Sequence, residues 1–329
     1  MAIRTVRDLV VSPGGPWKLR ALTGNRLRQD IRAWLSPPDP SVNFNVASDA
    51  RHEGTASWFT QSRTFNDWKV SGSLMWVHGK RIFSLFLCLL LLLICLRFYS
   101  GLWEERLYVR LPPAYLKQGT VSHYRLSTSS AIIQDVESTS DNGSVHLTYF
   151  FFDFKDIGKQ DSRALLSSIL VQLGDQSNFF NDILLALYSA HHHGSRQPND
   201  RSLAHCLEDM LRVPGEVPIY VIIDALDECP NTTGMPSPRD KALTLVENLV
   251  NLSIPNLRLC ITSRPEIDIR TSLEPLTCNR ISLHDQSGQR EDIVNFVGSV
   301  VYSDKNMRRW RDEDKVLVIK TLADKADGM

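Results

Sequence analysis

The sequence has no excess of charge of either sign, because 37 Lys and Arg residues balance 37 Asp and Glu residues. We therefore expect no nucleic-acid partner, since a surface for phosphate backbones usually shows as a basic excess or stripe. Cysteine is also scarce, and its six residues form no Cys-x-x-Cys pair. The scattered spacing and the length of the chain exclude a disulfide-stabilised miniprotein and favour a reducing, cytoplasmic compartment.

Long apolar runs are absent with one exception, which covers residues 82–96. A membrane-spanning helix needs about 20 apolar residues, with about 17 as the lower limit. The run is therefore marginal as a span by length, although it is strong by hydrophobicity. A span at this place would also pull the strand that precedes it toward lipid. We therefore treat a single-pass membrane anchor through 82–99 as a disfavoured alternative to a cytoplasmic protein.

Apolar runs typical of strands alternate with helical patterns through most of the chain. Strands are expected at 73–79, 146–153, 219–223, 257–261 and 280–283. Helical spacing of apolar residues is found over 129–138, after Asp161, and near 183–187, 203–211 and 242–250. This alternation predicts a mostly parallel sheet with helices on both faces, which is a three-layer α/β fold.

The same patterns divide the chain into segments. Residues 1–30 show no clear period, and we expect weak order there. Residues 31–80 lead into the first strand, 129–285 form the α/β core, and 286–329 begin a partial helical extension. Residues 81–128 are an insertion that contains the apolar run.

Three aromatic residues of the lead-in segment are spaced to share one helix face. They are Trp58, Phe65 and Trp68. We expect them to pack in the core rather than to contact a ligand.

A buried strand followed by acidic residues is the first sign of chemistry. Residues 219–223 are β-branched or aromatic and deliver Asp224 to the carboxyl edge of the sheet, where ligands bind in open α/β folds. A carboxylate there can hold Mg²⁺ that bridges nucleotide phosphates, and Asp227 or Glu228 can orient or deprotonate the attacking water. The plainer alternative is an ordinary strand with a solvated acidic turn, and the full pattern Asp-x-x-Asp-Glu disfavours it.

A second strand ends in polar residues of a complementary kind. Residues 257–261 lead into Thr262, Ser263 and Arg264, and Pro265 stops the strand. An Arg at this edge can sense or neutralise the charge of a γ-phosphate. By itself it could equally be a surface Arg in a turn, but its pairing with the acidic strand favours the phosphate role.

Together these motifs resemble the NACHT domains of fungal NOD-like receptors, also described as nephrocystin-3-like N-terminal domains, which are STAND P-loop NTPases. The resemblance covers residues 31–80 and 129–329. It is carried, in the order of the family, by Trp34–Pro40, Gly54–Phe59, Phe65–Trp68, Gly72–Lys80, Ser130–Val136, Tyr149–Phe154, Val221–Cys229 and Ile261–Pro265. It implies a switch driven by ATP or GTP with Mg²⁺, in which nucleotide binding controls effector domains of related proteins and self-association.

The family's phosphate-binding loop, Gly-Lys-x-Gly-x-Gly-Lys-Ser (Walker A), is missing here beyond its first two residues. Gly79 and Lys80 match its start, Arg81 then opens the insertion, and no Gly-Lys-Ser occurs in the chain. The missing glycines would wrap the phosphates with backbone N–H groups, and the missing Lys and Ser would reach phosphate oxygens and Mg²⁺. Removing 81–128 restores a spacing between Gly79 and Asp224 that fits the family, so we interpret the segment as a retained intron or a gene-model error.

The expected function is a nucleotide-binding signalling switch whose nucleotide affinity and hydrolysis are impaired by the interrupted loop. The residues expected to serve it are Gly79, Lys80, Thr262, Ser263 and Arg264 for the nucleotide, Asp224 for the metal, and Asp227 and Glu228 for catalysis. The alternative is a non-catalytic interaction fragment or pseudo-ATPase, with or without a membrane anchor. A DNA-processing ATPase is disfavoured by the neutral charge.

Overall fold

A computed structural model describes residues 17–50, 56–79, 121–139, 144–213, 215, 217–232, 236–277, 279–283, 287–303 and 307–326. Lys80 and the apolar run at 82–99 lie outside these residues. In the described part of the chain, no helix is long and apolar enough to cross a membrane. The anchor through 82–99 therefore stays a prediction.

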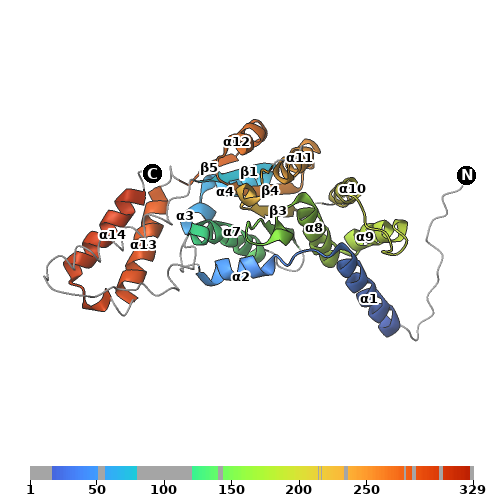
Figure 1. Ribbon diagram of the computed structural model, residues 1–329, viewed down its shortest axis with the longest axis horizontal. Coiled ribbons are helices and arrows are strands. Elements are labelled where there is room, and N and C mark those ends of the chain that lie inside the picture. Colours follow the sequence, from blue (N-terminus) through green and yellow to red (C-terminus); the bar gives the residue numbers. More distant parts are fainter. Residues whose placement is uncertain are drawn as a thin grey trace, which may run out of the picture.

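A parallel sheet lies at the centre of the molecule, with helices around it (Figure 1). It has five strands, all parallel, in the order β2-β3-β4-β1-β5. Its strands are β1 (Leu74–His78), β2 (His146–Phe151), β3 (Ile219–Asp224), β4 (Leu257–Ser263) and β5 (Asn279–Ser282). The predicted α/β fold with helices around a parallel sheet is confirmed. The pairing of His78 with Ser263 and of Ile223 with Ile261 brings the carboxyl ends of β1, β3 and β4 side by side.

The helices before and inside the sheet region are α1 (Trp17–Leu35), α2 (Ser41–Ala50), α3 (Ser57–Thr60), α4 (Arg63–Ser71), α7 (Val121–Ser138), α8 (Ser162–Gln176), α9 (Asn178–Ala190), α10 (Asp200–Leu211), α11 (Pro238–Asn251) and α12 (Ile267–Leu273). Helices α13 (Ser287–Ser303) and α14 (Asp312–Ala326) follow the last strand. Short 3-10 turns are η2 (Ile157–Lys159), η3 (Leu226–Glu228), η4 (Glu274–Leu276) and η5 (Met307–Arg309).

Side chains that start several helices supply the hydrogen bonds that a first turn lacks. Asp161 accepts the backbone N–H of Ala164 at 2.8 Å, as its position before an apolar helical pattern predicts. Ser237 and Asp240 form a reciprocal capping box at the start of α11, with Pro238 in the first turn. These caps fix where α8 and α11 begin, and so fix the loops that lead into them.

Two apolar clusters, one on each face of the sheet, form the core. Strand residues alternate between them: Trp76 and Ile223 face the layer of α8, α10, α11 and α12, whereas Val77 and Ile222 face the layer of α3, α4 and α7. Each layer covers an apolar face of strands that are buried throughout, as in β3 and β4. This packing accounts for the nearly continuous apolar strand sequences.

The lead-in aromatic residues occupy two short helices instead of one face of a single helix. The chain breaks at Ser62, whose side chain accepts the N–H of Phe65 and starts α4. Phe65 and Trp68 are fully buried and Trp58 is partly exposed. The expected packing role of Phe65 and Trp68 is confirmed.

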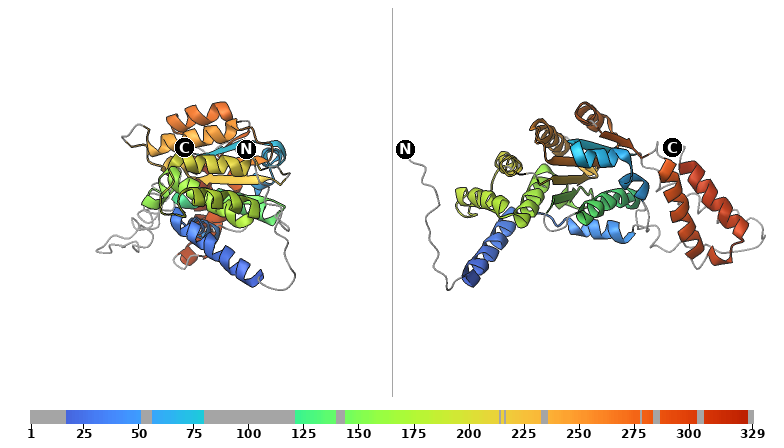
Figure 2. Two further views of the ribbon diagram at one scale, coloured as in Figure 1. Left: turned by 90° about the vertical axis from the view of Figure 1, so that its right-hand side faces the viewer. Right: turned by 180° about the vertical axis from the view of Figure 1, so that it is seen from behind.

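The two ends of the described chain carry helices that attach to the sheet domain by specific contacts. Helix α1 begins at Trp17, inside the stretch where the sequence shows no period; Trp34 near its end donates its indole N–H to the carbonyl of Arg196 at 2.9 Å. At the opposite end lie α13 and α14 (Figures 1 and 2). Asp292 of α13 accepts the N–H of Ala56 at 2.7 Å and the indole N–H of Trp58 at 2.9 Å.

Candidate functional site

The carboxylate of Asp224, at the carboxyl end of β3, is the centre of the candidate site. It is 1% exposed, and its Oδ1 accepts hydrogen bonds from the hydroxyls of Ser129 on α7 and Thr262 on β4, the latter at 2.5 Å. The two hydroxyls come from different elements that only the parallel sheet brings together. Asp224 is therefore held by two hydroxyl groups at the sheet edge where α/β folds bind ligands.

The turn after Asp224 is strained in a way that orients the acids which follow. Ala225 has φ 54° and ψ 43°, the left-handed conformation that side chains with a Cβ rarely adopt. Its N–H donates to Thr262 Oγ1 at 3.1 Å. The chain thus reverses directly after the strand and places Asp227 and Glu228 in the turn η3.

The two charged residues Asp227 and Arg264 contact each other. Arg264 Nε lies 2.8 Å from Asp227 Oδ2, and the backbone N–H of Arg264 donates to Asp227 Oδ1 at 2.8 Å. The structure therefore brings together two residues that the sequence assigned separately, one to water and one to phosphate. In this state each serves as the partner of the other.

Glu228 differs from Asp227 in its surroundings. Burial raises the pKa of the Glu228 carboxyl from an ordinary 4.5 to about 7; the backbone N–H of Phe154, 3.4 Å from Oε2, opposes the rise, and the nearby carboxylates Asp227, Asp224 and Asp153 add to it. A carboxyl with a pKa near 7 exchanges protons at neutral pH. Of the two acids in η3, Glu228 is thus the one suited to accept a proton from water.

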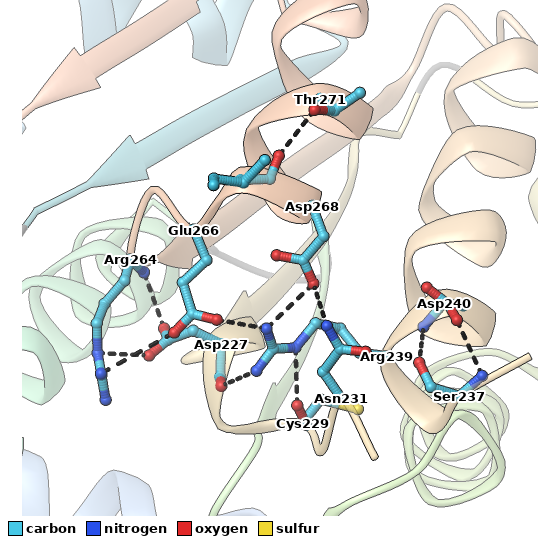
Figure 3. Close-up of polar contacts among 11 residues, drawn as sticks. Asp227, Cys229, Asn231, Ser237, Arg239, Asp240, Arg264, Glu266, Asp268 and Thr271 are labelled. Atoms are coloured by element: carbon cyan, nitrogen blue, oxygen red, sulfur yellow. Dashed lines mark hydrogen bonds and ion pairs between the residues drawn. The ribbon is translucent and has the colours of Figure 1, made fainter. Parts of the chain in front are cut away.

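Arg239 of α11 contacts this turn and lies beside Asp227 (Figure 3). It is 6% exposed and donates to the carbonyls of Asp227 at 2.6 Å and Cys229 at 2.9 Å. Its Nη1 also lies 2.5 Å from Glu266 Oε2 and 3.1 Å from Asp268 Oδ2. One buried guanidinium therefore ties η3 to the loop that follows β4.

The end of β1 lies beside this group. The N–H of Gly79 donates to the carbonyl of Ser263 at 3.4 Å, and the hydroxyl of Ser263 accepts the indole N–H of Trp76 at 2.8 Å. A Cβ on Gly79 would lie 3.3 Å from the side chain of Leu283, which is a tight approach. The start of the expected phosphate loop thus leaves the sheet next to Asp224 and Arg264, and Lys80 follows outside the described residues.

The residues present fit Mg²⁺ better than a softer metal. A buried carboxylate with the hydroxyls of Ser129 and Thr262 is a set of hard oxygen donors, the type that Mg²⁺ prefers. Among the described residues, no group of three or more His, Cys, Asp or Glu side chains could hold a metal by itself. A metal at Asp224 would accordingly complete its coordination with water and phosphate oxygens, which is usual for Mg²⁺.

The sequence did not identify Ser129 or Arg239 as site residues. Ser129 falls in a serine-rich helix start, and only its contact with Asp224 singles it out. Arg239 follows a proline-containing loop, where an Arg is most often on the surface. A signal was present in the capping box that begins α11, but it predicts a helix start and says nothing about the carbonyls that Arg239 contacts.

The family model described as Nephrocystin 3, N-terminal, matches residues 127–264. The match begins near the end of the insertion, so it contains Ser129, Asp224 and Arg264 but neither Gly79 nor Lys80. No curated protein matches the chain. Residues 127–264 therefore match the nephrocystin 3 N-terminal family, and the parallel α/β sheet of the chain is consistent with a P-loop NTPase.

Proposed function

We propose that this domain is a nucleotide-dependent signalling switch that binds ATP or GTP with Mg²⁺ at the carboxyl edge of its sheet. The observation that carries the proposal is the position of Asp224, a buried carboxylate that accepts hydroxyl hydrogen bonds from two neighbouring elements. Glu228 and Arg264 follow within the same edge. An Asp with a purely structural role does not require a proton-exchanging acid and a cation nearby.

Each residue has a chemical task in this proposal. Asp224 holds Mg²⁺, which when bound neutralises charge on the nucleotide phosphates. Glu228 orients the attacking water and accepts its proton, a role supported by its pKa near 7. Arg264 contacts the terminal phosphate, and Thr262 and Ser263 position the end of β4.

The interrupted Walker A loop supports a second part of the proposal, which is that the chain with residues 81–128 in place binds nucleotide poorly. Gly79 and Lys80 supply only the start of a loop that normally contacts every phosphate. A chain that keeps the acids and lacks this loop behaves as a pseudo-ATPase. It could then act in signalling only through its contacts with effector domains or with other copies.

Isothermal titration calorimetry with Mg²⁺–ATP and Mg²⁺–GTP tests both parts. The two proteins are the 329-residue chain and a repaired variant in which a complete Walker A sequence replaces residues 81–128. We expect micromolar binding only by the repaired variant. Adding Asp224→Asn to it should weaken binding at least about tenfold, whereas Asp182→Asn, which changes an exposed residue of α9, should not.

Two outcomes would contradict these expectations. Micromolar binding by the unmodified chain would show that the insertion leaves the phosphate site intact. No binding by a correctly folded repaired variant would refute the nucleotide-switch proposal itself.

A further inference from the structure

The ion pair between Asp227 and Arg264 uses both oxygens of one carboxylate on one residue. Oδ2 contacts the side-chain Nε and Oδ1 accepts the backbone N–H, each at 2.8 Å. The Asp227 side chain is 0% exposed and the Arg264 side chain is 25% exposed. The contact is thus a desolvated, two-point ion pair whose cationic member still reaches the surface.

Arg239 and Glu266 connect the two members of the pair (Figure 3). Arg239 donates to the backbone carbonyl of Asp227 at 2.6 Å and binds Glu266, whose other oxygen lies 4.0 Å from Nη1 of Arg264. Because Arg239 is itself buried, η3 and the loop after β4 cannot separate without losing its contacts. These contacts hold the backbone under the pair in place while its two side chains rearrange.

A phosphoryl group is a stronger partner for Arg264 than a carboxylate is. It carries more negative charge, and like a carboxylate it can accept two parallel hydrogen bonds from the planar guanidinium. The partly exposed Arg264 can therefore exchange its partner at the sheet edge. The exchange leaves the buried carboxylate of Asp227 without its counter-ion, which costs free energy. An anion that binds Arg264 only weakly does not offset this cost.

We propose that Asp227 is an internal counter-ion that holds Arg264 against η3, so that a phosphoryl group contacts Arg264 only by displacing the Asp227 carboxylate. The inference rests on the proposed function for the nature of the competing anion. It gives the two acids of η3 different roles, because Asp227 restrains Arg264 while Glu228 acts on water. The pair is then a gate on phosphate sensing.

Residue-specific arginine modification of the full chain with phenylglyoxal, read by mass spectrometry, tests this gate. Arg63, whose side chain is 94% exposed, is the internal reference in every sample. In the wild-type chain Arg264 should react more slowly than Arg63. Asp227→Asn should raise the Arg264 rate about tenfold, the size expected when a charge-assisted contact is removed, and should leave the Arg63 rate unchanged.

Matched variants separate this effect from a general loosening of the fold. Asp175→Asn removes the carboxylate of the exposed pair with Arg32 and should leave the Arg264 rate as in the wild type. Asp227→Glu keeps the charge and should stay within about twofold of the wild-type rate. Asp227→Ser gives a second uncharged variant with the same expected increase, in case the amide of Asn disturbs folding.

Adding inorganic triphosphate distinguishes the gate from the function on which it rests. We expect triphosphate to slow modification of Arg264 at lower concentration in Asp227→Asn than in its parent, when both carry the complete Walker A sequence of the repaired variant. An unchanged Arg264 rate in both uncharged variants would overturn the counter-ion role. A raised rate with no protection by triphosphate would confirm the counter-ion role, refute its displacement by phosphate, and count against Arg264 as a phosphate sensor.

Discussion

Glu228 is expected to make the folded chain less stable as the pH rises through neutrality. Its pKa is about 7 in the fold against 4.5 as an ordinary value, mainly because burial disfavours the charged carboxylate. Between these two pH values the folded state binds more protons than the unfolded state. Linkage then requires the free energy of unfolding to fall as pH increases over this range, and the effect is complete above pH 7.

The substitution Glu228→Gln removes this penalty because the amide does not ionise. With a folded pKa near 7, the variant should be more stable than the wild type by about 1 kcal/mol at pH 5 and about 3 kcal/mol at pH 8. Urea denaturation followed by tryptophan fluorescence at four pH values between these limits gives the difference directly. Any constant offset, such as a changed bond with Phe154, does not affect the slope.

The control for Glu228→Gln is Glu291→Gln, the same chemical change at an exposed position of α13, which should give no such trend. A stability gap that stays constant from pH 5 to pH 8 would refute the reasoning. A gap that closes as pH rises would do so as well, because it would mean that the fold favours the charged form of Glu228. Either result would also remove the support for Glu228 as the acceptor of a proton from water.

Two further changes probe the local structure around the site. Ala225→Gly should stabilise the fold by about 0.5–1 kcal/mol in the same denaturation assay, because glycine adopts the left-handed conformation of residue 225 without strain; a loss of stability would show that its methyl packing outweighs the strain. Trp58→Phe should destabilise the fold by about 1–3 kcal/mol and speed hydrogen exchange in α13. The reason is that Asp292 loses the hydrogen bond from the Trp58 indole and keeps the one from the N–H of Ala56. Unchanged exchange in α13 would mean that this contact does not hold the helix.

Much of the fold could be predicted from the local sequence because its strands are buried on both faces. A short uninterrupted run of β-branched and aromatic residues, as in β3, is typical of a strand buried on both faces. Asp161 and Ser237 cap the helices that follow them through contacts within the first turn. Helix α1 shows the opposite case. Its stretch has no clear apolar period, and its last turns are placed by a contact between Trp34 and the distant carbonyl of Arg196.

Part of the candidate site could be predicted from the sequence for the same reason. Asp224 and Arg264 each end an apolar strand, so their place at the carboxyl edge follows from the sequence once the sheet is parallel. The ion pair of Arg264 with Asp227 could not be predicted, since it depends on which strands are neighbours and on the reversal at Ala225.

The sequence by itself determined the fold class, the acidic and basic strand ends, and the interruption of the phosphate loop after Lys80, because these are properties of short segments. Only the tertiary structure decided that β1 lies between β4 and β5, that Ser129 meets Asp224, and that Arg239 ties η3 to the loop after β4. Those contacts join residues far apart in the chain, and their partners are chosen by strand order and packing.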